Sequence, residues 1–319
     1  MRTRVHSLSC GKTDMAAAPP TCLNPSRTQR TESRTGRAMT LRLGVLLGLF
    51  FVLIAGIRPA ISADKPLIFG VFPSMTAKQT VEVHRPLASA LEKHLGRRVV
   101  VYSARDFETF VARTRQGEYD ILLTAPHLAW LARQDVGYRP LLKYAQPVRG
   151  LLVVKSDSPL GELEALRGRT IAAADPLALV VMATQAQLTE RGLKHGIDYR
   201  TTDSGTHANS VMQVINGRAD AAMLGLHPYN LMPPDLRQQL RVLAETPPLS
   251  SLMYLTHPRL RDAEAQAVRQ ALLGFAATPE GQAFMQRGGY GGFADVDGRE
   301  LRAFRPYALQ AQEKLRNAR

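Results

Sequence analysis

Residues 67–123 read LIFGVFPSMTAKQTVEVHRPLASALEKHLGRRVVVYSARDFETFVARTRQGEYDILL, and this stretch decides the fold. Short apolar runs alternate in it with segments whose apolar residues recur at helical spacing. The runs predict strands and the spaced segments predict helices, in the order Leu67–Val71 (strand), Pro86–Leu95 (helix), Val99–Tyr102 (strand), Phe107–Arg115 (helix) and Tyr119–Leu123 (strand). A β-α-β-α-β order favours parallel pairing, so the sequence predicts a doubly wound α/β sheet.

A second set of the same kind begins after Arg149 and Gly150. Its predicted strands are Leu151–Val154, Thr170–Ala173, Tyr199–Thr202 and Ala219–Leu224, and its predicted helices are Leu163–Leu166, Ala183–Arg191 and Ser210–Asn216. Leu240–Ala244 then predicts an edge strand that returns toward the first set, and Leu252–Leu255 predicts a strand within that set. Two further helices are expected at Asp262–Phe275 and Pro279–Arg287.

The two sets predict two lobes that are joined by a hinge and separated by a cleft. We expect lobe I at 64–147 plus 249–319, and lobe II at 148–248. Because the chain crosses between the lobes twice, near 146–150 and near 246–250, closure about a hinge is geometrically available. Ligands of open α/β sheets bind beyond the carboxyl ends of the strands. Residues that follow the predicted strands are therefore the place to look for function.

Residues 1–63 predict a leader that lies outside the lobes. The segment Leu43–Ile57 is apolar and uncharged, and it lies between an arginine and a run of small residues. A charged start, an apolar run too short to span a membrane comfortably and a small-residue cleavage zone are typical of a secretory signal peptide. Cleavage after Ser62 or Ala63 fits this pattern, with Met39 as the expected start of translation and an uncleaved anchor as the alternative. The mature chain is expected in the periplasm.

Charge and composition exclude several classes of protein. The net charge is +14, but residues 1–63 hold nine basic and two acidic residues, which leaves 32 basic and 25 acidic residues, a net of +7. The lobes contain no basic stripe or aromatic stacking motif, so a nucleic-acid partner is not expected. Cys10 and Cys22 both lie in the leader, which leaves the mature chain without a disulfide, a thiolate metal site or a Cys nucleophile. A nucleophile elbow, a P-loop and a His-Glu-x-x-His motif are also missing, so we expect neither an enzyme nor a cofactor.

Seven phrases that span most of residues 66–293 resemble, in the same order, the PhnD-like family of phosphate, phosphite and phosphonate binding proteins of ABC transporters. They are GVFPS (70–74), HRPLASALEKHLGRRV (84–99), GEYDILLTAPHLAWLARQDVGYRPL (117–141), LGELEALRGRTIAAADP (160–176), DSGTHANSVMQVINGRADAAML (203–224), RVLAETPPL (241–249) and TPEGQAFMQRGGYGGF (278–293). The resemblance implies a type II periplasmic-binding fold. It also implies a monomer that captures a small anion for an ABC permease in the inner membrane.

The chain departs from the family pattern at one strand end. Family members that bind phosphonates typically carry a Ser-Thr-Ser run after an Asp-Pro dipeptide, whereas residues 175–180 read DPLALV. Ala129 also stands where the family usually has a tyrosine. Each lost charged hydrogen bond is expected to weaken oxyanion binding by about 1.5–3 kcal/mol. These departures favour an alternative, a sensory or scaffold protein of the same fold that signals a solute to a membrane kinase.

Candidate ligand-binding residues follow the predicted strands: Ser74, Met75, Thr124, His127, Asp175, Thr206, His207, His227 and Tyr229. Converging imidazoles can bind an oxyanion when protonated or a metal when neutral. No His pairing or carboxylate partner supports a metal, so none is expected. Plainer interpretations remain open: a turn for Ser74, a helix N-cap for Thr206, core packing for Tyr229 and local hydrogen bonds for the histidines.

Overall fold

The first sheet has the strand order β11-β4-β10-β3-β1-β2 in the computed structural model, which describes residues 65–317. Its strands are β1 (Leu67–Val71), β2 (Val99–Ser103), β3 (Ile121–Thr124), β4 (Arg139–Tyr144), β10 (Met253–Thr256) and β11 (Phe293–Ala294). β1 pairs in parallel with β2 and β3, whereas β10 runs antiparallel to β3 and β4. The predicted signal peptide, its cleavage sites and Met39 lie outside the described residues.

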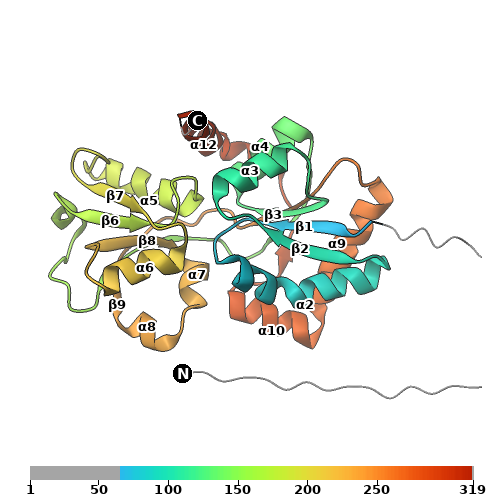
Figure 1. Cartoon of the computed structure of the whole chain (residues 1–319), viewed down its shortest axis with the longest axis horizontal. Coiled ribbons are helices and arrows are strands. Elements are labelled where there is room, and N and C mark those ends of the chain that lie inside the picture. The colour runs from blue at the N-terminus through green and yellow to red at the C-terminus, as the bar shows by residue number, and fades with distance from the viewer. Residues whose placement is uncertain (1–64, 318–319) are drawn as a thin grey trace, which may run out of the picture. The chain divides into compact units, whose positions relative to one another are not determined.

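Helices cover both faces of this sheet. They are α2 (Ala77–Leu95), α3 (Phe107–Arg115), α4 (Pro126–Val136), α9 (Asp262–Ala277), α10 (Pro279–Gly288), α11 (Gly298–Ala303) and α12 (Arg305–Asn317). Figure 1 shows α3 and α4 over one face, with α2 and α10 over the other. No helix among residues 65–317 is long and apolar enough to cross a membrane.

The second sheet has the strand order β7-β6-β8-β5-β9. It consists of β5 (Gly150–Lys155), β6 (Thr170–Ala173), β7 (Arg200–Asp203), β8 (Ala221–Gly225) and β9 (Leu240–Glu245), with η1 (Leu163–Leu166), α5 (Leu179–Glu190), α6 (His207–Ile215), α7 (Leu226–Asn230) and α8 (Pro234–Gln238) between strands. β6 pairs in parallel with β7 and β8, and β5 runs antiparallel to β8 and β9.

The α/β fold with two sheets is therefore confirmed, but parallel pairing is limited to three strands at one edge of each sheet, β3-β1-β2 and β7-β6-β8. β5 enters the second sheet directly from the first connection, and β10 enters the first sheet directly from the second connection. Without a crossover helix before them, these strands run against their neighbours. Both sheets are mixed as a result.

Three helices begin earlier than their apolar stripes predict, and one of them is α6, which begins at His207 rather than at Ser210. α2 begins at Ala77 rather than at Pro86, because Thr76 and Gln79 form a capping box in which each side chain accepts the other's backbone N–H at 3.3 Å. α5 begins at Leu179 rather than at Ala183. Its first turns are buried all round, so they show no periodic stripe for a sequence pattern to detect.

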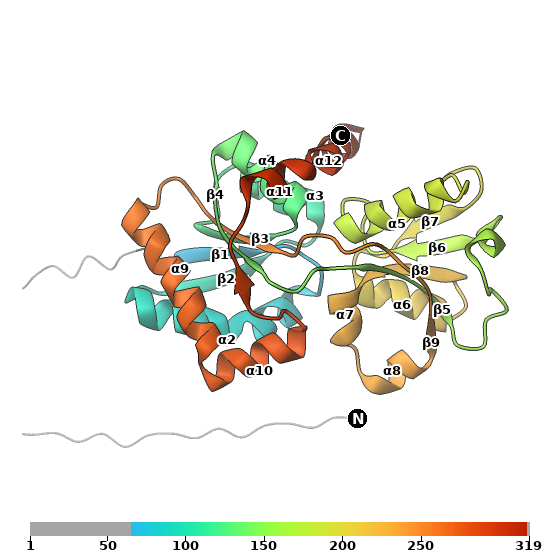
Figure 2. The same cartoon turned by 180° about the vertical axis from the view of Figure 1, so that it is seen from behind.

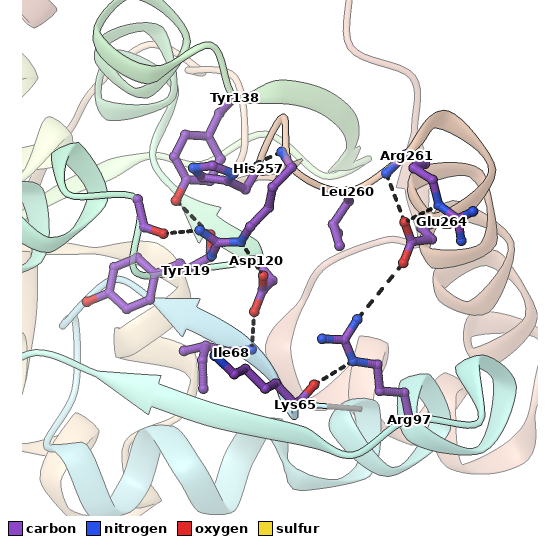
Figure 3. Close-up of polar contacts among 12 residues, drawn as sticks. Lys65, Ile68, Arg97, Tyr119, Asp120, Tyr138, His257, Leu260, Arg261 and Glu264 are labelled. Atoms are coloured by element: carbon purple, nitrogen blue, oxygen red, sulfur yellow. Dashed lines mark hydrogen bonds and ion pairs between the residues drawn. The ribbon is translucent and has the colours of Figure 1, made fainter. Parts of the chain in front are cut away.

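A buried carboxylate fixes the start of β1 against β3. Asp120, just before β3, accepts the backbone N–H of Ile68 at 2.7 Å and the Nε–H of Arg259 at 2.6 Å (Figure 3). Asp220 has the same place before β8, where it accepts the N–H of Thr170 at 2.9 Å. The two sheets are thus built on the same local plan.

Two connections link the sheets, and they lie side by side in Figure 2. Val148 of the first and Leu249 of the second exchange backbone hydrogen bonds of 3.0 and 2.8 Å. We propose that each sheet with its helices is one lobe, with lobe I at 64–147 plus 249–319 and lobe II at 148–248. The paired connections then form the hinge.

Candidate functional site

A small cavity of about 40 Å³ lies between residues that follow strands of both sheets. It has room for roughly three water molecules. Its walls are mainly apolar and consist of Phe72, Ser74, Phe107, Ala125, Pro126, Val148, Ala178, Leu179, Val180, His207, Gly225, His227, Pro228 and Leu252. This is the position in which a two-sheet α/β protein is expected to hold a ligand.

Four helices of at least nine residues begin at this cavity: α3, α4, α5 and α6. The first amides of a helix have no intrahelical acceptor, and the helix dipole adds a partial positive charge there. Asp106 caps α3 and Thr206 caps α6 through their side chains, whereas α5 has no side-chain cap. α4 has no side-chain cap either, so the first-turn amides of both α4 and α5 lack a side-chain acceptor.

His207 contributes a buried imidazole to the wall of the cavity. It is 3% exposed, and its Nδ1 has no hydrogen-bond partner. Burial, with a smaller contribution from the nearby His227, lowers the pKa of His207 to about 4. The imidazole is consequently neutral near pH 7, and it can donate from one nitrogen and accept at the other.

The other two predicted histidines bond across the gap between the lobes. His127, in α4, donates from Nε2 to the carbonyl oxygen of Leu177 at 2.9 Å. His227, in α7, donates from Nδ1 to the carbonyl oxygen of Gly288 at 2.6 Å, and its Nε2 accepts the hydroxyl of Tyr290 at 2.8 Å. Burial lowers the pKa of each imidazole to about 4, so both are neutral near pH 7.

Asp175 is buried beside the cavity but is not part of its wall. Its carboxylate accepts the N–H of Leu177 at 2.7 Å. Burial raises the pKa of Asp175 to about 6, and the carboxylates of Asp203 and Asp106 raise it as well, while hydrogen bonds from the Leu177 and Phe107 amides oppose these effects. The Asp175 carboxyl group of lobe II therefore lies near the start of α3 in lobe I.

The remaining predicted residues lie at different distances from the wall. Ser74 lines the cavity, and Met75 next to it is half-buried outside the wall. Thr124 is fully buried with an unpartnered hydroxyl, but it does not line the cavity. Thr206 accepts the N–H of Asn209 as an N-cap, and Tyr229 packs against the smaller apolar core of the second sheet. Ligand contact by these residues stays a prediction.

Sequence reasoning missed the apolar walls of the cavity. Phe72 follows β1 directly and Phe107 opens α3, so both stand at positions where polar residues were sought. Their positions at a strand end and at a helix start could have identified both residues from the sequence. It also missed Leu177 and Tyr290 as partners of the two histidines, because contacts across a hinge have no sequence spacing.

Residues 69–301 match the family described as "ABC transporter, phosphonate, periplasmic substrate-binding protein". This match covers most of the chain and almost all of both lobes. The chain belongs to this family. It is therefore a substrate-binding protein rather than an enzyme, and the predicted family is confirmed. Membership implies a small solute as ligand, a membrane permease as partner and export from the cytoplasm.

Solved structures support the same fold at low sequence identity. PhnD1 from Prochlorococcus marinus, solved with methylphosphonate, has a TM-score of 0.69 at 13% identity, covering 78% of this chain and 98% of that chain. A binding protein component of an ABC phosphonate transporter from Pseudomonas aeruginosa has a TM-score of 0.68 at 18% identity, covering 78% and 87%. XAC2383 from Xanthomonas citri, solved with ATP, has a TM-score of 0.62 at 21% identity, covering 77% and 98%.

Proposed function

We propose that this phosphonate-family binding protein captures a small oxyanion in the cavity at the start of α5. The oxyanion belongs to the class of phosphate, phosphite and phosphonates. The carrying observation is that four helices begin at one buried cavity whose wall also holds an unpartnered imidazole. Backbone amides at helix starts are suited to anionic oxygens. The neutral His207 adds a further donor beside them.

The charge that we propose for the solute rests on the absence of cationic side chains from the wall of the cavity. Among the residues that line the cavity there is no Lys or Arg, and the histidines there are neutral near pH 7. Burying an ion without a counter-charge is costly, and the cost rises steeply with the charge of the ion. Helix starts offer only about half an elementary charge each. We therefore propose a monoanion with a compact apolar substituent rather than a dianion.

The apolar walls are consistent with such a substituent. Phe72, Phe107 and Leu252 line the cavity and can contact a methyl or methylene group. In this proposal the oxygens are directed to the α5 amides. We further propose that the apolar segment at 43–57 is a signal peptide that exports the chain to the periplasm. The mature protein would then work there as a monomer that delivers solute to the permease.

A ligand screen tests this function. Thermal unfolding of the purified protein is followed with phosphate, phosphite, methylphosphonate, sulfate and acetate, and calorimetry measures any hit. A ligand that prefers the folded form raises the melting temperature. We expect saturable binding of a monoanionic oxyanion, weakened at least tenfold by His207→Ala but not by His94→Ala at an exposed site. Well-folded protein that binds none of these probes contradicts the proposal.

The small cavity favours a second candidate, the sensory or scaffold function. The cavity of about 40 Å³ between apolar walls is small, so the lobes pack mainly on each other's side chains. Residues 175–180, which lead into α5, include no residue with a hydroxyl group. A protein that closes without solute can act through a protein partner in the membrane. Failure of the ligand screen, together with retention on a membrane kinase rather than on a permease, would favour this candidate.

A further inference from the structure

His127 and His227 stand in corresponding places of the two lobes. Each is the second residue of the helix that follows the strand opened by Asp120 or Asp220, since α4 begins at Pro126 and α7 begins at Leu226. His127 of lobe I bonds to Leu177 of lobe II, and His227 of lobe II bonds to Gly288 and Tyr290 of lobe I. The two contacts are reciprocal.

Both contacts need neutral imidazoles. In His227, Nδ1 donates to a carbonyl oxygen, so the deprotonated Nε2 can accept the Tyr290 hydroxyl. In His127, Nε2 donates to Leu177, and the buried Nδ1 has no partner. A proton added to His127 would therefore be buried without an acceptor, and one added to His227 would replace an acceptor by a donor. Opening the lobes returns these nitrogens to water.

The surroundings of His227 offer no compensation for a positive charge. The titratable groups that face it are imidazoles and phenols: His84 of α2, His207 of α6 and Tyr290 after α10, on which Tyr144 of β4 stacks with ring centroids 3.7 Å apart. Protonation of His227 would also disfavour protonation of the other two imidazoles. Burial already lowers the pKa of His84, His207 and His227 to about 4 each.

The surroundings of His127 contain charged groups near its acceptor. Asp175 bonds to the Leu177 N–H, and Lys314 of α12 donates to the Pro176 carbonyl oxygen at 3.1 Å. Asp106 of α3 and Asp203 of β7 act on Asp175. Because burial raises the pKa of Asp175 to about 6, closure takes up a proton at this carboxyl while it releases protons at the imidazoles.

We propose that His127 and His227 form a reciprocal pair of latches that hold the lobes closed only while both imidazoles are neutral, so that closing the cleft releases protons. The proposal concerns closure itself and goes beyond the identity of the solute. Protonation of each latch in the open form would reduce the closed population by up to about tenfold per pH unit below pH 6.5. Acid would then open the protein before it unfolds the lobes.

Distance measurement between the lobes tests the latches. In the full chain with Cys10→Ser and Cys22→Ser, fluorophores are attached through Glu108→Cys on α3 and Ala208→Cys on α6, both exposed. Energy transfer reports the distance between the lobes, and far-UV circular dichroism reports the fold at each pH. We expect the distance to increase as the pH falls from about 7.5 toward 4.5, at constant helix content.

Substitutions separate the latches from other titrating groups. In His127→Gln/His227→Asn, amides replace the donor nitrogens without titrating, so we expect the acid-induced increase in distance to be strongly reduced. Any response that remains then comes from other groups at the junction, such as His207 and Asp175. His94→Gln, on the exposed face of α2, is the control and should titrate as the unsubstituted chain does. His227→Lys introduces a charge at neutral pH and should open the lobes at pH 7.5 with the helix content kept.

Three results would overturn the proposal. One is a constant distance in the unsubstituted chain while it remains folded. Another is a pH dependence that persists unchanged in His127→Gln/His227→Asn. The third is an acid transition in which distance and helix content change together. None of these measurements needs a solute, so a failed ligand screen and a failed latch are separate outcomes.

Discussion

His127 and His227 have equivalent positions in the two lobes, and each donates to a backbone carbonyl of the opposite lobe, at 2.9 Å to Leu177 and at 2.6 Å to Gly288. The cavity lies at the same junction, with His227 and His207 in its wall. Solute capture and lobe contact therefore use neighbouring side chains. Substitutions at the start of α5 test the cavity, and substitutions of Asp120 and Asp220, which precede β3 and β8, test the stability of each sheet.

A hydroxyl placed at the cap of α5 should stabilise the protein. Ala178 is the N-cap, its backbone is extended, and no side chain caps the helix. Ala178→Ser gives the first turn an acceptor, which typically contributes about 1 kcal/mol to the free energy of unfolding. We expect a higher urea midpoint with an unchanged slope. Ala183→Ser, in the buried interior of the same helix, is the control and should lower the midpoint.

The same substitution bears on the solute. Because the hydroxyl introduced by Ala178→Ser can also donate to an oxyanion, we expect tighter binding of methylphosphonate in the calorimetric screen, by about tenfold for one added hydrogen bond. Equal or weaker binding, in a protein that is stabilised as expected, would mean that the α5 start does not contact the oxyanion.

The carboxylates at the base of the two sheets should differ in their contribution to stability. Asp120 accepts Ile68 N–H and Arg259 Nε–H, and its side chain is 10% exposed, whereas the Asp220 side chain is 35% exposed. Loss of a carboxylate from a buried charged network leaves its donors unpaired. We expect Asp120→Ala to cost about 3 kcal/mol and Asp220→Ala about half as much, measured by urea unfolding. Equal losses would contradict the assigned burial.

Much of the fold can be predicted from the spacing of apolar residues, and the elements that were predicted wrongly show the limits of that method. Thr170–Ala173 and Phe107–Arg115 match their predicted limits, because short apolar strands and amphipathic helices bounded by Gly or a capping side chain carry a clear period. The start of α5 was missed because burial on all sides removes that period. Strands β5 and β10 were predicted, but their antiparallel direction was not, because local order does not encode strand direction.

The candidate site could be predicted in position but not in detail. Residues after strands converge in this fold class, so His207 and Ser74 were found from their place in the chain. The partners of His127 and His227 come from distant segments, at Leu177 and Gly288, whose roles depend on how the lobes meet. Tertiary contacts across a hinge leave no local signal in a single sequence.

A methyl group added in the middle of β1 should disrupt lobe I. A Cβ at Gly70 would lie 2.4 Å from Cγ of Tyr119, whose fully buried ring also stacks on Phe110. Overpacking of this kind costs about 1–3 kcal/mol because the ring has to shift. We expect Gly70→Ala to lower the free energy of unfolding by that amount. Gly161→Ala has open space around its Cβ, so it should change stability by no more than about 1 kcal/mol.

Acid should destabilise the folded chain steeply. Burial lowers the pKa of four histidines from 6.5 to about 4: His84, His127, His207 and His227. Between these values the unfolded chain binds more protons than the folded chain, so the histidine contribution is present above pH 6.5 and is lost as the pH falls toward 4. Asp175 acts in the opposite sense, because burial raises its pKa from 3.8 to about 6 and the folded chain then gains a proton.

While the lobes stay closed, the free energy of unfolding should fall by at most about 4 kcal/mol per pH unit, which corresponds to a net difference of three protons. Opening of the lobes returns His127 and His227 to water and removes their share of this slope. Urea unfolding at a series of pH values between 7.5 and 4.5 measures this slope. His84→Leu removes a buried imidazole that takes no part in the contacts between His127 or His227 and their partners, so it should reduce the slope by about one proton, whereas His94→Leu at an exposed site should leave it unchanged. A stability that stays flat between pH 7 and 5 would show that the four imidazoles are already protonated or hydrated in the folded protein, because only equal proton binding by both states removes the dependence.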